Sequence, residues 1–184
     1  TGLLIICYGK YTKKIESMQA LEKGYKGTFE LGKTTPSFDL ETAVDNEYPY
    51  DHISPAFLEE KLEQFRGEIK QVPPQYSAVK VNGKRAYEHA RKGKKIELKI
   101  RDAYISKFDV DHSSFPKLHF EINCSKGTYI RSLARDLGYA LDSGAYMSSL
   151  VRTSIGDYPI SDAVQISDIR DTEDFFKFAR QLTS

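Results

Sequence analysis

Apolar and polar residues alternate in several short stretches of the chain, and this alternation predicts strands. Residues 25–31 (Tyr-Lys-Gly-Thr-Phe-Glu-Leu) follow the pattern of a half-buried strand. Residues 96–110 and 117–124 are also strand-like, and the polar residues between them predict a connecting loop over 111–116. Residues 3–8 form a short apolar run that predicts a buried strand.

Helical spacing is clearest after Gly127. The apolar residues on one face of this predicted helix are Ile130, Leu133, Ala134, Leu137, Ala140 and Leu141. A second helix is predicted to begin at Ser54-Pro55, because serine caps helices and proline suits the first helical position. We expect further helices near 15–21 and over 167–181, the latter acidic at its start and basic near its end.

Strands and helices occur in mixed order along the chain, without strict alternation. Residues 144–160 alternate loosely and are expected to return to the sheet. Residues 72–95 contain several prolines and glycines and predict irregular structure with one short helix near 84–92. The sequence therefore favours an α+β fold, with a mixed, mostly antiparallel sheet flanked by helices.

The bulk properties are those of a soluble globular domain. The chain has 184 residues, 40% of them hydrophobic and 29% charged, which suits one domain with a core of its own. Apolar runs are far shorter than the ~20 residues that a membrane span needs, so we expect no membrane partner. Cys7 and Cys124 have no Cys or His at metal-ligand spacing, which favours a reducing, cytoplasmic location. We expect a monomer and no metal site.

Positive charge is concentrated in the middle of the chain. Residues 66–101 contain eleven Lys and Arg against three Glu, a net charge of +8, whereas the whole chain carries only +1. A patch of this kind is typical of a surface that follows a phosphate backbone. A solvated, lysine-rich hairpin explains the charge equally well.

Aromatic rings and cations are interleaved after Pro73-Pro74. The residues are Tyr76, Lys80, Lys84, Arg85, Tyr87, His89 and Arg91. Flat rings among phosphate-binding cations are what looped or single-stranded RNA requires, so the segment modestly favours nucleic-acid binding. The alternative is a solvated connection whose tyrosines pack underneath it.

Tyr129 and Arg131 lie at a predicted strand-to-helix junction. Arginine can pair with a carboxylate or phosphate through two hydrogen bonds, and tyrosine can stack on a base. Spacing alone favours the alternative, in which Tyr129 fills a core edge and Arg131 faces water. Taken alone, Tyr25 is a strand tyrosine and Asp39 a turn residue. Hydrolase, phosphate-loop and metal-site motifs are absent from the sequence.

Three segments together resemble one family. They are Tyr25–Gly32 with Thr34–Asp39, then Pro73–Gly83 with Tyr87 and Ala90-Arg91, then Lys126–Arg131 with Asp136–Gly138 and Leu150–Arg152. Their order and spacing resemble the TruB family of bacterial tRNA pseudouridine-55 synthases, over residues 1 to about 160. The resemblance implies a pseudouridine synthase fold.

The resemblance also implies a reaction and a partner. Enzymes of this family isomerise a T-loop uridine of tRNA to pseudouridine. They flip the base into a pocket, an Asp carboxylate attacks covalently, and the base is rotated and rejoined through carbon. The T-arm of tRNA is thus the implied partner, and no metal or organic cofactor is implied.

Site roles follow from the same resemblance. Tyr25 is similar to the tyrosine that stacks on the flipped base, Tyr129 to a second active-site tyrosine, and Arg131 to the arginine that pairs with the nucleophile. Leu150 is similar to an apolar pocket residue, and Asp39 and Arg152 fit a charge network around Arg131. The implied RNA-contacting insertion spans about 70–95, with the residues Tyr76, Lys80, Lys84, Arg85, Tyr87 and Arg91.

The sequence departs from the family at its beginning. The nucleophile of the family lies in a Gly-Thr-Leu-Asp-Pro-Leu-Ala-Thr-Gly segment, and this sequence starts at the final Thr1-Gly2. We therefore expect residues 1–184 to be a partial catalytic domain without a C-terminal PUA-like domain, and to give no turnover alone. The alternatives are a non-catalytic tRNA-binding or chaperone module and a protein-interaction domain that kept the motifs.

Overall fold

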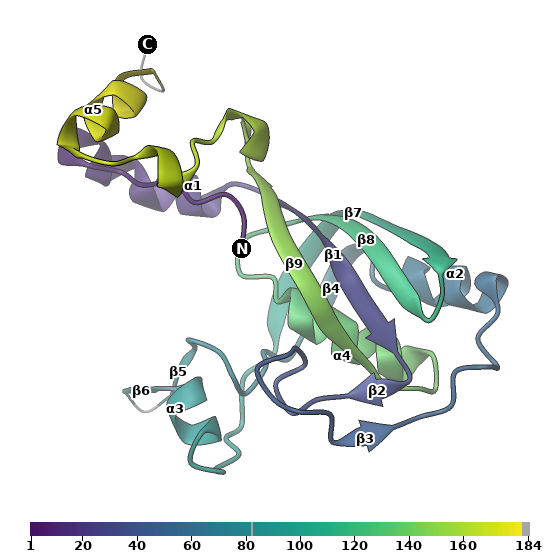
Figure 1. The fold of residues 1–184 in the computed structure, drawn as a ribbon. Helices are drawn as coiled ribbons and strands as arrows, with labels where there is room; N and C mark the ends of the chain where they lie inside the picture. The colour runs from purple at the N-terminus through teal and green to yellow at the C-terminus, as the bar shows by residue number, and fades with distance from the viewer. Residues whose placement is uncertain (82, 182–184) are drawn as a thin grey trace.

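A six-stranded sheet is the centre of the fold (Figure 1). The computed structural model describes residues 1–81 and 83–181. The strand order is β10-β9-β1-β8-β7-β4, and each neighbouring pair is antiparallel. The strands are β1 (Lys23–Leu31), β4 (Gly67–Gln71), β7 (Arg101–Ser114), β8 (Lys117–Cys124), β9 (Ala145–Ile155) and β10 (Tyr158–Pro159). The predicted α+β class is confirmed.

Two helices complete the hydrophobic core. Leu133 and Leu137 of α4 (Ile130–Ala140) have no exposed surface and join a cluster with Phe29 of β1. The helix α2 (Pro55–Glu63) adds Leu58 and Leu62 to the same cluster. Its predicted start is confirmed, because the Ser54 hydroxyl accepts a hydrogen bond from the Phe57 N–H at 3.2 Å.

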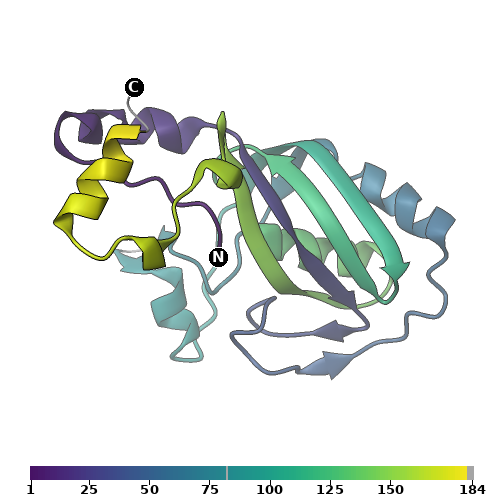
Figure 2. The same cartoon turned by 45° about the horizontal axis from the view of Figure 1, so that its top comes forward.

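Two segments, one near each end of the described chain, pack together in an arm that projects from the sheet (Figures 1 and 2). We define the arm as residues 4–22 and 160–181. It contains the 3₁₀ helix η1 (Gly9–Lys14), α1 (Ile15–Ala20), η2 (Ile160–Asp162), η3 (Ile166–Asp168) and α5 (Thr172–Gln181). The Tyr8 ring holds the two parts together, with ring centroids 5.5 Å from Phe175 and 6.0 Å from Phe176. The helices predicted near 15–21 and 167–181 are confirmed, although the second begins only at Thr172.

A second projection, the basic lobe (residues 72–96), leaves the sheet after β4 and returns before β7. It consists of a short hairpin, β5 (Lys80–Val81) and β6 (Lys84–Arg85), followed by α3 (Ala86–Ala90). The predicted short helix near 84–92 is therefore confirmed. A further two-stranded sheet, β2 (Lys33–Thr34) and β3 (Asn46–Glu47), lies beside the end of β1.

The predicted strand at residues 3–8 is wrong. Only Gly2 bridges to Arg152 of β9, and the Leu3 N–H donates to the Arg152 carbonyl at 2.8 Å. The chain then leaves the sheet edge for the arm, so that Leu4 and Ile6 are 66% and 68% exposed. The predicted loop at 111–116 is also shorter than expected, because β7 continues to Ser114 and pairs there with Lys117. β7 also begins later than predicted, at Arg101 and not at residue 96.

Candidate active site

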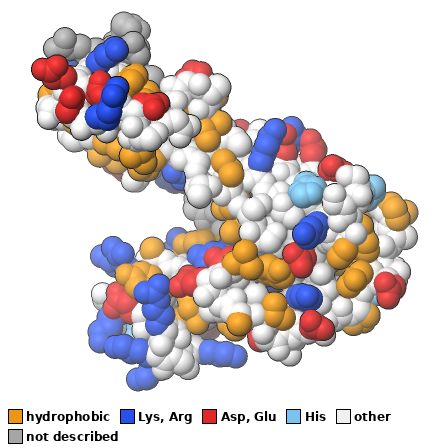
Figure 3. Space-filling model, in the orientation of Figure 1, with side chains coloured by type: hydrophobic (Ala, Val, Ile, Leu, Met, Phe, Trp, Pro, Cys, Tyr) orange, Lys and Arg blue, Asp and Glu red, His pale blue; other side chains and the backbone are white. Residues whose placement is uncertain are grey.

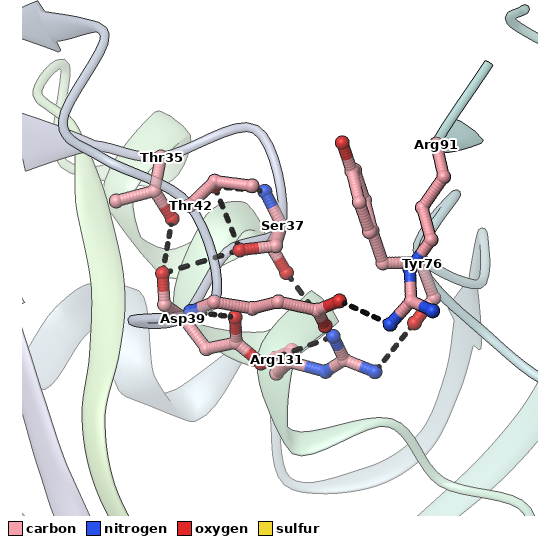
Figure 4. Close-up of polar contacts among 8 residues, drawn as sticks. Thr35, Ser37, Asp39, Thr42, Tyr76, Arg91 and Arg131 are labelled. Carbon is pink, nitrogen blue, oxygen red and sulfur yellow. Dashed lines mark hydrogen bonds and ion pairs between the residues drawn. The ribbon is translucent and has the colours of Figure 1, made fainter. Parts of the chain in front are cut away.

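Arg131 connects three segments that lie far apart in the sequence. It sits in the first turn of α4, and its Nη1 lies 3.0 Å from Asp39 Oδ2. Its Nη2 donates to the Tyr76 carbonyl at 2.7 Å and its Nη1 to the Ser37 carbonyl at 3.4 Å (Figure 4). Both charged side chains are only about one-fifth exposed, so the ion pair is largely shielded from water. The guanidinium is therefore held in one orientation.

The loop that carries Asp39 is fixed by hydroxyl groups (Figure 4). Thr35 Oγ1 and Ser37 Oγ donate to the Asp39 carbonyl at 2.7 and 3.2 Å, and Thr42 Oγ1 lies 2.8 Å from Ser37 Oγ. Phe38 adopts a left-handed backbone with φ 61°, and its carbonyl accepts from Met147 of β9 at 2.9 Å. Sequence reasoning did not single out Ser37, although clustered Thr and Ser around Pro36 indicate such a turn.

Tyr129 is the N-cap residue of α4 and is partly buried. A cap residue has an N–H that the helix does not satisfy. Here the Tyr129 N–H donates to Gln71 Oε1 at 3.1 Å, and Gln71 Nε2 donates back to the Tyr129 carbonyl at 3.3 Å. Sequence reasoning also missed Gln71, whose only sequence signal is its place directly before the two prolines.

Tyr25, Leu150 and Arg152 lie together where β1 pairs with β9. Tyr25 pairs with Arg152, and Leu150 pairs with Gly27 two residues along β1. Tyr25 and Leu150 both pack against the core. Burial raises the pKa of the Tyr25 hydroxyl, and the positive charge of Arg152 acts against that rise. The phenol is therefore protonated at neutral pH and can donate a hydrogen bond.

The first residues of the chain lie along this same edge. Thr1 Oγ1 donates to the Leu150 carbonyl at 3.0 Å, and Arg152 Nε donates to the Leu3 carbonyl at 2.7 Å. The structure thus joins Asp39 directly to Arg131, as the predicted charge network requires, whereas the guanidinium of Arg152 is engaged with Leu3. The N-terminus of the chain reaches the strand that carries Leu150 and Arg152.

Cys124 is buried close to Tyr25, and the pKa of its thiol offers a test of that burial. Burial raises the pKa of its thiol from the ordinary value near 9 to about 11. Since the thiolate is the reactive form, we expect thiol reagents at pH 8 to modify the partly exposed Cys7 much faster than Cys124 in the folded protein. Unfolding in urea should make the two rates similar. Equal rates in the folded protein would contradict the buried position.

The same shift predicts a loss of stability at high pH. Between about pH 9 and 11 the unfolded thiol ionises while the folded one stays protonated, so the free energy of unfolding should fall with rising pH. Urea titrations of the wild type and of Cys124→Ala at pH 8 and 10.5 isolate this effect from other groups. The free energy of unfolding should fall less in the variant than in the wild type. Equal falls in the two proteins would mean that another group causes the loss of stability.

The basic lobe presents its cations to solvent. Lys80, Lys84, Arg85 and Arg91 are all exposed, and Lys and Arg side chains crowd this part of the surface (Figure 3). The guanidinium groups of Arg85 and Arg91 lie 5.9 and 5.3 Å from the centre of the Tyr87 ring. Figure 3 shows the molecule hollowed between this lobe and the arm.

Two contacts fasten the basic lobe to the Asp39 loop. The Arg91 guanidinium pairs with Glu41 at 2.9 Å, and the Tyr76 carbonyl binds Arg131 as described above (Figure 4). Arg131 and Asp39 therefore share one connected network with Tyr76 and Arg91 of the basic lobe. The Arg91–Glu41 pair was not predicted from the sequence, because the two residues are 50 positions apart.

Within 1–81 and 83–181, no group of three or more His, Cys, Asp and Glu side chains is placed to hold a metal ion. Over the same residues, no helix is both long and apolar enough to cross a membrane.

Family profiles match nearly the whole chain. The N-terminal domain of the TruB family pseudouridylate synthases matches residues 1–130, and the C-terminal domain of tRNA pseudouridylate synthase B matches residues 131–181. The chain belongs to the TruB family. The family predicted from three short segments is thereby confirmed. The boundary between the two profiles falls at the start of α4, so both matched parts contribute strands to one sheet.

Individual relatives agree with this family. tRNA pseudouridine synthase B of Flavobacterium johnsoniae is 50% identical over 167 residues, which cover 91% of this chain and 73% of that protein. The protein of the same name from Chloroherpeton thalassium is 44% identical over 170 residues, covering 92% of this chain and 70% of that one.

Solved structures support the fold of this TruB-family chain. A chain in the crystal structure of a Cbf5-Nop10-Gar1 complex superposes with a TM-score of 0.68 at 24% identity. The match covers 96% of this chain but only 43% of the solved chain, so this chain spans less than half of that protein. The predicted pseudouridine synthase fold is confirmed.

Proposed function

We propose that this TruB-family chain forms the substrate pocket of an enzyme that isomerises the T-loop uridine at position 55 of tRNA to pseudouridine. The observation that carries the proposal is the fixed guanidinium of Arg131, bound to Asp39 and to the Tyr76 carbonyl beside Tyr129. Family membership supplies the reaction class, and the named relatives are tRNA pseudouridine synthases. The non-catalytic binding alternative has no support from these relatives.

Each side chain has a task in this proposal. The Tyr25 ring stacks on the flipped uracil, and the apolar side chain of Leu150 lines the space beside it. Arg131 holds the carboxylate nucleophile and stabilises charge that develops as the glycosidic bond breaks. Tyr129, at the start of α4, provides a hydroxyl close to the base. The chain needs no redox chemistry, because the reaction breaks one bond to the base and forms another.

The nucleophile in this proposal comes from the segment that precedes Thr1 in the family. Thr1 contacts Leu150, so a carboxylate a few residues earlier would enter the pocket from the edge of β9. Asp39 pairs with Arg131 until that carboxylate is present, and afterwards both carboxylates pair with the Arg131 guanidinium.

Substrate binding in the proposal uses the basic lobe. The T-arm lies in the hollow between the lobe and the arm, with its phosphates on Lys80, Lys84, Arg85 and Arg91. Tyr76 and Tyr87 offer rings to unstacked bases at the edge of the lobe. The enzyme acts as a monomer in the cytoplasm.

A tritium-release assay tests the proposed reaction. Rejoining uracil to ribose through C5 releases the C5 hydrogen, so a T-arm stem-loop labelled there should release tritium to water with the full-length protein. An RNA in which cytidine replaces the target uridine is the control. Residues 1–184 alone should bind the stem-loop without releasing tritium, because the proposed nucleophile precedes Thr1. Tritium release by residues 1–184 would overturn that assignment, and no release by the full-length protein would overturn the function.

A further inference from the structure

We propose that Gln71 is a positioning residue for Tyr129 and Arg131, and that Gln75 has the corresponding task at the base of the basic lobe. Each glutamine side chain forms two hydrogen bonds with the backbone of a single distant residue. The inference rests on the function proposed above, which it deepens by separating a residue that sets turnover from one that sets RNA affinity.

Gln71 joins the end of β4 to the start of α4. The side chain is only 2% exposed, and it both accepts from the Tyr129 N–H and donates to the Tyr129 carbonyl. This arrangement copies the paired bonds that a neighbouring β-strand would form. A buried amide is suited to the task, because it carries a donor and an acceptor without a charge. The orientation of the Tyr129 backbone, and hence of Arg131 two residues later, depends on it.

Further bonds fasten the same helical turn to the residue after Gln71. The Ser132 hydroxyl, which has no exposed surface, donates to the Val72 carbonyl at 2.9 Å. Arg135 Nη2 donates to the same carbonyl at 3.2 Å. These two bonds hold side chains of α4, whereas the Gln71 bonds hold the backbone of Tyr129.

Gln75 repeats the arrangement four residues later. Its Nε2 donates to the Ile96 carbonyl at 2.7 Å, and its Oε1 accepts from the Ile96 N–H at 3.1 Å. Because Gln75 and Ile96 stand at the two ends of the basic lobe, this pair closes the lobe at its base. Pro73 and Pro74 lie between the two glutamines and fix φ, so they keep the two amides at a set separation. The segment therefore holds the catalytic turn with one amide and the RNA-contacting lobe with the other.

Four variants of the full-length protein test whether Gln71 acts on turnover and Gln75 on RNA affinity. Gln71→Glu and Gln75→Glu keep the acceptor but lose the donor at neutral pH, and Gln71→Leu and Gln75→Leu lose both. We expect the Gln71 variants to lower kcat for T-arm RNA by about tenfold to a hundredfold with KM within about twofold, because small misplacements of catalytic groups are costly. The Gln75 variants should raise KM about tenfold with kcat within about twofold, since a loose lobe must be ordered on binding.

Hydrogen exchange at the Tyr129 amide gives a readout that does not depend on activity. Exchange should accelerate at least about tenfold in Gln71→Leu, which removes the acceptor of the Tyr129 N–H, and less in Gln71→Glu, which keeps it. It should stay unchanged in both Gln75 variants. Unchanged Tyr129 exchange in Gln71→Leu, or the same kcat and KM changes from both glutamines, would overturn the inference. A wild-type protein that isomerises no uridine, yet shows the expected exchange pattern, would instead reject the proposed function and leave the backbone clamp in place.

Discussion

Replacing Arg131 by alanine in the full-length protein is expected to lower turnover of T-arm RNA by about 10²–10³-fold while changing RNA affinity less than about threefold. A fixed charge that stabilises the transition state typically contributes an effect of this size. The Arg131 guanidinium is shielded from solvent and contacts Asp39 and the Tyr76 carbonyl. It differs in this from the cations of the basic lobe, which are exposed. Its loss should therefore act on the reaction and not on binding.

Three companion variants show whether the effect comes from the charge, from its geometry or from the fold. Arg131→Lys keeps the charge but cannot contact Asp39 and the Tyr76 carbonyl with the same planar fork, so it should recover only a small part of the activity. Asp39→Asn should lower turnover less than Arg131→Ala, because it leaves the guanidinium in place. Arg135→Ala removes a neighbouring arginine of the same helix that contacts Val72, and should change kcat less than about threefold.

Single-turnover tritium release and filter binding separate the two quantities for each variant. Thermal unfolding checks that each variant is folded, since the loss of Arg131 leaves the Asp39 carboxylate without its partner. Normal turnover in a folded Arg131→Ala protein would remove Arg131 from the active site. Equal losses in Arg131→Ala and Arg135→Ala would instead indicate a general effect on α4.

Periodicity predicted the elements that bury a clear apolar face. The helix after Gly127 and the strand at residues 25–31 follow directly from spacing, because their buried residues recur with the period of the element. The run at residues 3–8 shows the limit of this reasoning. Its apolar residues suit a strand, but strand pairing depends on a neighbour, and only the first three residues lie beside β9.

Residues of the candidate site could be named from the sequence, but the contacts that connect them could not. Tyr25, Asp39 and Arg131 were identified from motifs, and the Asp39–Arg131 ion pair joins two of these motifs across 92 positions. The contacts of Arg131 with Ser37 and Tyr76 use backbone carbonyls, and those of Gln71 use the backbone of Tyr129. Side-chain identity carries no signal for a backbone acceptor, so the sequence could not indicate these bonds.

Neutralising three cations of the basic lobe, Lys80→Gln, Lys84→Gln and Arg85→Gln together, is expected to weaken T-arm binding by at least about tenfold at physiological salt. These side chains are exposed, and no carboxylate ion pair is described for any of them, so they are free to contact phosphates. Each phosphate contact releases a counterion and contributes about 0.7–0.9 to the slope of log K against log salt. The slope should therefore decrease by about 2–3 in the triple variant, whereas kcat at saturating RNA should stay within about threefold.

A charge-matched triple variant tests whether position matters as well as charge. Lys33→Gln, Lys61→Gln and Lys117→Gln lower the net charge by the same amount on the strands and the helix α2, away from the lobe, and two of these lysines already pair with Glu47 and Glu60. We expect this protein to bind the T-arm within about twofold of the wild type and with an unchanged slope. Equal salt slopes in the two triple variants would mean that overall charge, and not the basic lobe, attracts the RNA. A steep slope that survives in the lobe variant would move the phosphate contacts to another face, and the arm, with Lys10, Lys13 and Lys14 in η1, would be the next surface to neutralise.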